Sequence, residues 1–164
     1  MNQAIRELAE NVAVPFETAR AMPKSVYTSD EFLKAEIEHI FKQDWFCAGR
    51  ADSLANAGDY LTLTLAGQPI MVLRDHQGFL RAQSNVCRHR MSTLLEGRGQ
   101  IKTITCPYHA WTYGLDGRLR GAPAMDQNAA FKRADYVLPQ ARCEEWLGWI
   151  MVSLNPNAPA VATQ

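Results

Sequence analysis

The chain has 164 residues with 17 basic and 17 acidic side chains, so its net charge is near zero. That balance removes the usual electrostatic reason to expect nucleic acid or an anionic membrane as a partner. Hydrophobic residues make up 47% of the sequence, enough for a core, yet no apolar run approaches the roughly 18 residues that span a bilayer. The N-terminus lacks signal-peptide architecture, so we expect a soluble, cytoplasmic protein of one domain with an appended segment.

Two helices are predicted ahead of the main body. Residues 4–12 form the first, and a proline-containing connector follows. The second begins at Thr28, where Thr28 and Glu31 have the spacing of a capping box, and it runs to about Asp44. Its apolar face is expected to comprise four residues at helical spacing, Leu33, Ile37, Ile40 and Phe41. We therefore expect residues 1–45 to form a helical extension.

A β-rich body is predicted from residue 46 onward. Alternating apolar residues and turn signals predict strands at 60–65, 69–74, 79–85, 100–105 and 146–154, with a hairpin around 114–117. Several short strands with regular turns indicate a mainly β fold of small antiparallel sheets. We place this domain at 46–156, and the Pro- and Ala-rich residues 157–164 are interpreted as the remnant of a linker towards a further domain.

The residues that carry chemistry fall in two predicted loops between these strands. Cys87-Arg88-His89 is followed, after sixteen residues, by Cys106-Pro107-Tyr108-His109. Two ligands on one tight turn reach one metal without a further ordering cost. Four cysteines in a chain without a secretory signal do not suggest disulfides. The sequence therefore predicts a site of two thiolates and two imidazoles.

Three interpretations of these residues compete. Structural zinc accepts two Cys and two His, but zinc sites usually pair Cys with Cys and His with His, whereas each pair here is mixed. A second interpretation is that the cysteines are merely buried and the histidines merely hydrogen-bonded, although two such pairs fall within 23 residues. In a Rieske [2Fe–2S] centre one iron takes two thiolates and the other two imidazoles. That interpretation accounts for the residue types, their order and their spacing together.

The other cysteines and histidines are expected to have ordinary structural places. Cys47 and Cys143 are predicted to be small core residues. His39 falls on the second predicted helix and is expected on its surface, and His76 falls in a predicted turn.

At the two loops the sequence resembles the Rieske non-haem iron oxygenases, that is, the α subunits of ring-hydroxylating oxygenases. The cluster segments of that family read approximately CxHRG and CPYHGWTY, and here they read CRHRM and CPYHAWTYGLDG. The resemblance covers about residues 24–156. Met91 and Ala110 depart from it, since glycine is usual at both positions, and these departures concern the loop conformation rather than the ligands.

The resemblance implies a [2Fe–2S] cluster on Cys87, His89, Cys106 and His109. It also places three residues around the cluster, Tyr113, Trp111 and Arg90. Tyr113 matches a tyrosine whose hydroxyl is expected to hydrogen-bond a ligand sulfur. Trp111 stands where respiratory Rieske proteins have a serine donor, so we expect a potential at the low end of the roughly −150 to +300 mV range.

The resemblance further implies the electron-transfer domain of an oxygenase that uses NAD(P)H-derived electrons and O2 to hydroxylate, dihydroxylate or demethylate a small organic substrate. It implies a reductase or ferredoxin as donor, and a mononuclear Fe(II) in the catalytic domain of the same or a neighbouring subunit, with a homotrimer as the whole enzyme. We expect no catalytic iron site in this chain, because the two remaining histidines, His39 and His76, fall on separate predicted elements, a helix and a hairpin turn. The alternative is a stand-alone Rieske ferredoxin, against which the N-terminal helical region argues.

Overall fold

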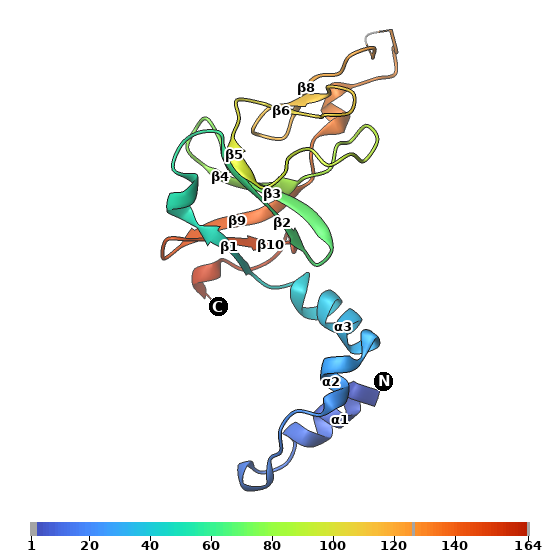
Figure 1. Cartoon of the computed structure of the whole chain (residues 1–164), viewed down its shortest axis with the longest axis vertical. Coiled ribbons are helices and arrows are strands. Elements are labelled where there is room, and N and C mark those ends of the chain that lie inside the picture. The colour runs from blue at the N-terminus through green and yellow to red at the C-terminus, as the bar shows by residue number, and fades with distance from the viewer. Residues whose placement is uncertain (1–2, 126, 164) are drawn as a thin grey trace. The chain divides into compact units, whose positions relative to one another are not determined.

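The computed structural model describes residues 3–125 and 127–163. The chain divides into two compact units, Met1–Lys42 and Gln43–Gln164 (Figure 1). Throughout the two described ranges, every helix is too short or too polar to cross a membrane.

The first unit is helical. It contains α1 (Gln3–Val12), a 3₁₀ turn at Phe16–Thr18, α2 (Lys24–Thr28) and α3 (Asp30–Glu36), which continues as a π-helical turn at Ile37–Phe41. The Ser25 hydroxyl on α2 donates a hydrogen bond to the Glu7 carboxylate on α1, which ties these two helices together.

The cap and the apolar face of α3 differ from the sequence prediction. Ser29, and not Thr28, is the N-cap, since its hydroxyl accepts a hydrogen bond from the Phe32 N–H at 3.2 Å. Phe32 is buried, whereas Leu33 and Ile40 are 49% and 46% exposed. The predicted face assumed 3.6 residues per turn through Phe41, but the π turn replaces that period with i→i+5 hydrogen bonds.

The second unit is built on two antiparallel sheets, which confirms the predicted mainly β class. The larger sheet has seven strands, in the spatial order β1 (Phe46–Arg50), β10 (Trp149–Ser153), β9 (Gln140–Trp146), β4 (Leu80–Ser84), β3 (Gln68–Arg74), β2 (Asp59–Leu65) and β5 (Arg98–Gln100). The smaller sheet has three, β6 (Ile104–Thr105), β7 (Thr112–Tyr113) and β8 (Leu119–Gly121). Short 3₁₀ turns lie at Ala51–Leu54, Arg133–Tyr136 and Val161–Thr163.

Strand β3 separates two hydrophobic cores. Met71 and Leu73 join the core that contains both loop cysteines, whereas Ile70 and Val72 join the core under β1 and β10. Successive side chains of a strand point to opposite faces, so one apolar run can serve both cores. The cluster-side core is therefore anchored directly on the middle of the larger sheet.

Two predicted strands are each divided in the structure. Residues 146–154 are not one strand but the last residue of β9, a turn and the whole of β10, because Leu147 and Gly148 have φ values of +49° and +81° and form the turn between the two strands. Residues 100–105 are also divided, since β5 ends at Gln100 in the larger sheet and β6 begins at Ile104 in the smaller one. The intervening residues carry the chain from one sheet to the other.

The segment expected to be a linker remnant packs on the second unit over its described residues. Ala158 and Val161 are buried beside Trp45, whose indole N–H donates to the Pro159 carbonyl at 2.8 Å. The Val161 N–H donates to the Glu144 carboxylate at 3.0 Å. The domain limits 1–45, 46–156 and 157–164, and the role of the last segment as a linker, stay predictions.

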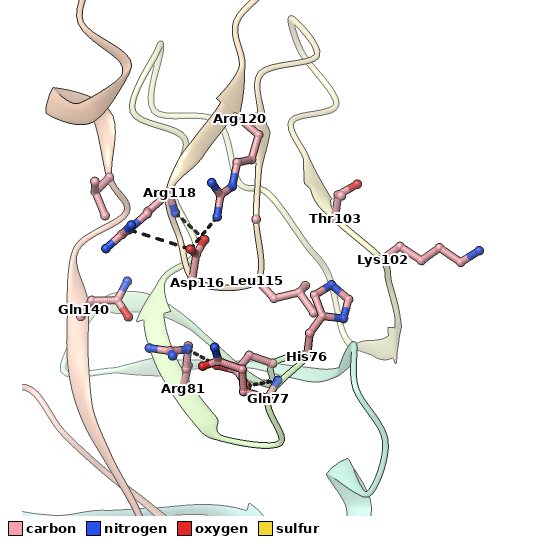
Figure 2. A pocket seen from close by; sticks show the side chains of 13 residues that line it. His76, Gln77, Arg81, Lys102, Thr103, Leu115, Asp116, Arg118, Arg120 and Gln140 are labelled. Atoms are coloured by element: carbon pink, nitrogen blue, oxygen red, sulfur yellow. Dashed lines mark hydrogen bonds and ion pairs between the residues drawn. The ribbon is translucent and has the colours of Figure 1, made fainter.

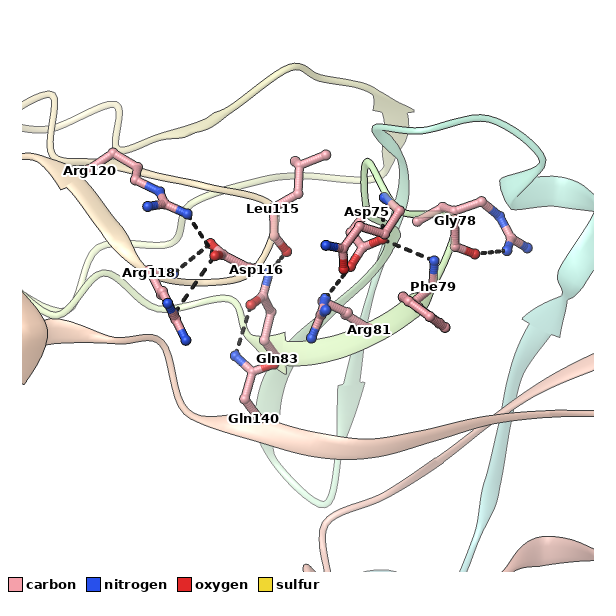
Figure 3. A network of polar contacts seen from close by, with 12 residues as sticks. Asp75, Gly78, Phe79, Arg81, Gln83, Leu115, Asp116, Arg118, Arg120 and Gln140 are labelled. Atoms are coloured by element: carbon pink, nitrogen blue, oxygen red, sulfur yellow. Dashed lines mark hydrogen bonds and ion pairs between the residues drawn. The ribbon is translucent and has the colours of Figure 1, made fainter.

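A buried pair of glutamines connects the smaller sheet to the larger one (Figure 3). Gln83 on β4 is fully buried, donates to the Leu115 carbonyl at 3.4 Å, and accepts from the Gln140 amide at 3.0 Å. Leu115 lies in the turn that follows β7. Gly117 closes this turn at φ +79°, and a Cβ there would overlap Gln83 Oε1 and lie 2.7 Å from Gln140 Nε2. The turn after β7 is thus held in place by the large sheet.

Candidate metal centre

The two loops that carry the cysteine–histidine pairs share one backbone conformation. In the first, the Met91 N–H donates to the Cys87 carbonyl at 3.1 Å, and in the second the Ala110 N–H donates to the Cys106 carbonyl at 3.1 Å. Met91 and Ala110 have φ values of +56° and +55°, in the left-handed region. Each loop therefore wraps back on its own cysteine and presents a histidine on the way. Met91 and Ala110 thus hold, without glycine, the left-handed conformation that glycine adopts most readily.

The four predicted ligands come together as two like pairs. Cys87 and Cys106 are 1% and 3% exposed and belong to the same hydrophobic core. The rings of His89 and His109 meet edge to face, with centroids 4.9 Å apart. A thiol pair below an imidazole pair is the ligand arrangement that two irons of a Rieske cluster require.

The loop backbone favours a thiolate at Cys106. Burial alone raises the pKa of this thiol, but hydrogen bonds from the backbone N–H groups of His109 and Tyr108 lower the pKa below its ordinary value. Hydrogen bonds to the charged form of a group stabilise that form. Since thiolates and not thiols bind metals, the second loop is prepared to supply one.

His89 presents a buried nitrogen that has no hydrogen-bond partner. Within residues 3–125 and 127–163, His89 Nδ1 is the buried side-chain nitrogen or oxygen left without one. Burial, and then the charges of His109 and Arg90, lower the pKa of His89 below its ordinary value, so the ring is neutral. A buried unpaired nitrogen costs free energy unless something binds it, and a neutral imidazole nitrogen is what a metal accepts. The residues present therefore fit a metal group between the loops.

A stack of aromatic rings fixes the His89 imidazole. Trp111 is 2% exposed and lies parallel to the His89 ring, with centroids 4.7 Å apart. Phe131 and Tyr136 meet the Trp111 indole edge to face, at 5.5 and 5.2 Å. Phe131 and Tyr136 were not predicted as site residues, because they lie outside both motifs and their spacing in the sequence does not indicate a contact with Trp111.

Tyr113 lies beneath the thiol pair. Its hydroxyl is 3.3 Å from Cys87 Sγ and accepts a hydrogen bond from the Arg88 N–H at 3.0 Å. Burial raises the pKa of Tyr113, so the hydroxyl keeps its proton. Because the Arg88 N–H already fills an acceptor position on the oxygen, the hydroxyl proton is available to Cys87. Tyr113 is thus placed to donate to a ligand sulfur.

The remaining predicted residues lie apart from this centre. Arg90 is exposed in the first loop and acts on His89 through its charge. His39 and His76 are both exposed, on the π turn and on the turn after β3. The prediction that Cys47 is a core residue is wrong: it is exposed on β1, an edge strand with a bulge between Cys47 and Gly49. Cys143 is half-buried, and burial raises its pKa to about 12.

No three His, Cys, Asp or Glu side chains converge on a single ion position anywhere in the two described ranges. A [2Fe–2S] cluster does not need such a group, because each iron takes two protein ligands and completes its coordination with inorganic sulfide.

Comparisons with known proteins agree with this chemistry. The sequence pattern of the Rieske [2Fe-2S] domain matches residues 44–140, a range that contains both loops. The carnitine monooxygenase oxygenase subunit of Escherichia coli (strain K12) is 38% identical over 158 residues, which cover 96% of this chain and 42% of the relative. The glycine betaine monooxygenase oxygenase subunit of Pseudomonas aeruginosa is 34% identical over 142 residues, which cover 86% of this chain and 33% of the relative. The chain thus spans less than half the length of these relatives.

Solved structures show the same domain. A quaternary ammonium Rieske monooxygenase, studied for carnitine oxidation and inter-subunit electron transfer, superposes with a TM-score of 0.83 at 38% identity, covering 87% of this chain and 39% of the other. Naphthalene 1,2-dioxygenase from Rhodococcus sp. superposes with a TM-score of 0.90 at 26% identity, covering 99% of this chain and 38% of the other. With both cysteine–histidine loops inside the matched region, the chain belongs to the Rieske [2Fe-2S] domain family.

Proposed function

We propose that Cys87, His89, Cys106 and His109 hold a Rieske cluster and that the chain passes single electrons within an oxygenase subunit. The observation that carries this proposal is the arrangement of the four residues: both cysteines lie in one buried core, the two imidazole rings meet edge to face, and His89 Nδ1 is buried and unpartnered. The bound cluster supplies reversible one-electron chemistry, at a potential that imidazole ligation raises above that of an all-cysteine cluster.

The protein residues around the site have separate tasks. Trp111 holds the plane of the His89 ring, Tyr113 donates a hydrogen bond to Cys87, and the burial of Cys87 and Cys106 keeps water from both sulfurs. His109 is exposed at the loop surface. Its outer ring nitrogen can exchange a proton with solvent, so that the affinity for an electron and the affinity for that proton depend on each other.

In the longer protein, we infer, electrons come from an NAD(P)H-dependent reductase or a ferredoxin and leave for a mononuclear Fe(II) on the same or a neighbouring subunit of a homotrimer. The relatives named above are monooxygenase oxygenase subunits, and a similar structure was studied for inter-subunit electron transfer. Both substrates in those names, carnitine and glycine betaine, are quaternary ammonium compounds. The longer protein is accordingly proposed to oxidise a substrate of that class with O2.

The alternative of a stand-alone Rieske ferredoxin is not supported. The match to an oxygenase subunit extends over 96% of the chain, so it includes the helical first unit and is not confined to the cluster domain.

Reconstitution tests the cluster directly. The chain, loaded with iron and sulfide under anaerobic conditions, is expected to be red-brown, to contain two irons and two acid-labile sulfides per chain, and to give the low-average-g resonance of a reduced Rieske centre. Cys106→Ser should lose the cluster, whereas the matched change at the exposed Cys47, Cys47→Ser, should keep it. Zinc in place of iron and sulfide would contradict the proposal.

A test of the substrate class needs the longer protein together with its reductase. Carnitine, glycine betaine and choline are expected to give product-coupled O2 and NAD(P)H consumption, and naphthalene is not. Coupled turnover of the aromatic compound alone would overturn the quaternary ammonium assignment while leaving the cluster proposal intact.

A further inference from the structure

A cationic groove lies beside the turn that follows β7. A pocket of about 740 Å³ runs between the turn after β3, residues Lys102 and Thr103, and the hairpin from Gly114 to Arg120 (Figure 2). A second pocket of about 340 Å³ has Arg118, Arg120 and Val137 in common with the first, so the two are neighbours. We call the two pockets together the basic groove.

Cations outnumber carboxylates in the basic groove. The carboxylates that line it are Asp75 and Asp116, and its cations are Arg81, Lys102, Arg118, Arg120 and Arg133. Asp75 is paired with Arg81 at 2.6 Å. One carboxylate, Asp116, serves both Arg120 at 2.7 Å and Arg118 at 3.9 Å, and Figure 2 shows the two guanidinium groups converging on it. The Arg118 and Arg120 side chains are 71% and 57% exposed, so they also face whatever enters the groove.

The groove lies in the basic part of a chain whose other residues are acidic overall. Residues 68–140 contain ten Lys or Arg and five Asp or Glu, a net charge of +5, although the whole chain is neutral. A concentrated field of one sign attracts a partner of the other sign and speeds their encounter. The partner that fits this surface is therefore acidic.

The groove is close to the thiolate side of the site. Strands β6 and β7 are each two residues long. Thr103, which lines the groove, directly precedes β6, and Cys106 directly follows it. Three residues of extended chain span about 10 Å. Tyr113, whose hydroxyl is 3.3 Å from Cys87 Sγ, is followed directly by Gly114 in the groove wall. The exposed His109 lies on the loop at the other end of this ribbon.

We propose that the basic groove docks the acidic surface of the protein that supplies electrons, so that electrons enter from the thiolate side and leave from the imidazole side. The proposal rests on the function proposed above. In the step itself the donor loses one electron and the site between the two loops gains it, with no bond made or broken.

The test uses an acidic plant-type [2Fe–2S] ferredoxin, reduced beforehand, as the probe donor. At low salt, rapid mixing with the cluster-loaded chain should give a second-order rate that falls steeply as ionic strength rises. Lys102→Glu with Arg118→Glu should lower that rate about tenfold or more and flatten its salt dependence. The control, Lys24→Glu with Arg98→Glu, makes the same change in net charge at two exposed residues that do not line the groove. Its second-order rate with ferredoxin should stay within about twofold of the wild-type rate.

Carbodiimide cross-linking gives a readout independent of the redox reaction. It joins lysine amines to carboxylates, so mass spectrometry should find the ferredoxin on Lys102 and not on Lys24, Lys34 or Lys42 of the first unit. Equal effects of the two double variants, or cross-links only in the first unit, would overturn the docking site. The neutral pair Lys102→Gln with Arg118→Gln, checked for an unchanged visible spectrum, guards against a folding defect.

The two proposals fail in different ways. If even dithionite does not reduce the chain, the proposed electron-transfer function itself is contradicted. If dithionite reduces the chain, but the groove substitutions leave the rate of its reaction with ferredoxin unchanged, only the docking proposal is contradicted.

Discussion

The indole of Trp111 lies on the imidazole of His89 with the two planes 6° from parallel, while the Nδ1 atom of that imidazole is buried without a partner. A ring fixed in this way presents its nitrogen in one direction before any metal arrives. Preorganisation of this kind removes an ordering cost from ligand binding.

Trp111→Ala should therefore damage both stability and the cluster. Removing a buried tryptophan costs roughly 3–5 kcal/mol of the free energy of unfolding, and the freed His89 ring should broaden the g anisotropy of the reduced cluster. The control is Trp149→Ala, because the Trp149 side chain is 41% exposed and its ring meets the Arg50 guanidinium in a cation–π contact at 5.1 Å. That change should cost about 1 kcal/mol or less and leave the resonance unchanged.

Tyr113→Phe should lower the reduction potential. The hydroxyl donates to a ligand sulfur, which carries more negative charge when the cluster is reduced, so its loss disfavours reduction. One hydrogen bond is worth about 0.5–1.5 kcal/mol, and 59 mV corresponds to about 1.4 kcal/mol for one electron, so the shift should be at most about 60 mV. Tyr60→Phe removes a hydroxyl that donates to the Glu96 carbonyl, and should leave the potential where it was. An unchanged potential in Tyr113→Phe would make this tyrosine a packing residue.

His109→Cys should lower the potential towards the roughly −400 mV of plant-type ferredoxins, because an anionic thiolate replaces a neutral imidazole. It should also weaken the dependence of the potential on pH above neutrality, since one of the two titratable rings is gone. Protein-film voltammetry between pH 6 and 10 measures both effects. The matched change at a histidine away from the site, His76→Cys, should alter neither the potential nor its pH profile; an equal response from both variants would contradict the ligand role of His109.

The motifs predicted which four residues lie together at the proposed site, because each pair occupies one short turn, where sequence spacing determines spatial spacing. Cys87 and His89, like Cys106 and His109, can approach one position whatever the rest of the fold does. The strand alternation at 60–65 and 69–74 was equally local, and β2 and β3 lie there.

Features that depend on distant contacts could not be predicted in this way. Phe131 and Tyr136 reach Trp111 only because the loop after β8 folds back over it. Cys47 was expected in the core as a small apolar residue, but its position on an edge strand depends on the pairing of β1 with β10 across a hundred residues. The strand β9 was missed because four of the residues in Gln140–Trp146 are polar or charged and none of the seven is fully buried.

Ala110→Gly should stabilise the protein. Ala110 has a φ of +55°, a left-handed conformation that costs an L-residue roughly 1–2 kcal/mol and costs glycine little. The greater freedom of glycine in the unfolded chain offsets part of this, so a net gain of about 0.5–1 kcal/mol in the free energy of unfolding is expected. Met91→Gly, at φ +56°, should behave alike.

The control for the glycine substitutions is Ala35→Gly within α3, which should lose about 1 kcal/mol because glycine is unfavourable inside a helix. Thermal unfolding of the cluster-loaded proteins, compared at equal cluster content, separates the three variants. A loss of stability in Ala110→Gly would show that the alanine methyl group makes a contact worth more than the backbone strain.

Asp75 should make stability depend on pH at the acid end. Burial alone raises the pKa of this carboxyl, but hydrogen bonds from Arg81 at 2.6 Å and from the backbone N–H groups of Phe79 and Gln77 lower it below its ordinary value. A group whose pKa is lower in the folded state stabilises that state above the unfolded pKa, which is about 3.9 for aspartate, and this contribution is lost as the pH falls through the folded pKa.

Asp75→Asn removes the charge and should cost roughly 1–3 kcal/mol at pH 7. The gap between wild type and Asp75→Asn in urea unfolding should stay constant from pH 7 to 5 and narrow below about pH 4. Asp52→Asn changes a carboxylate whose side chain is 72% exposed, and should show no such gap; a gap for Asp75→Asn that widens in acid would reverse the sign of the argument and contradict it.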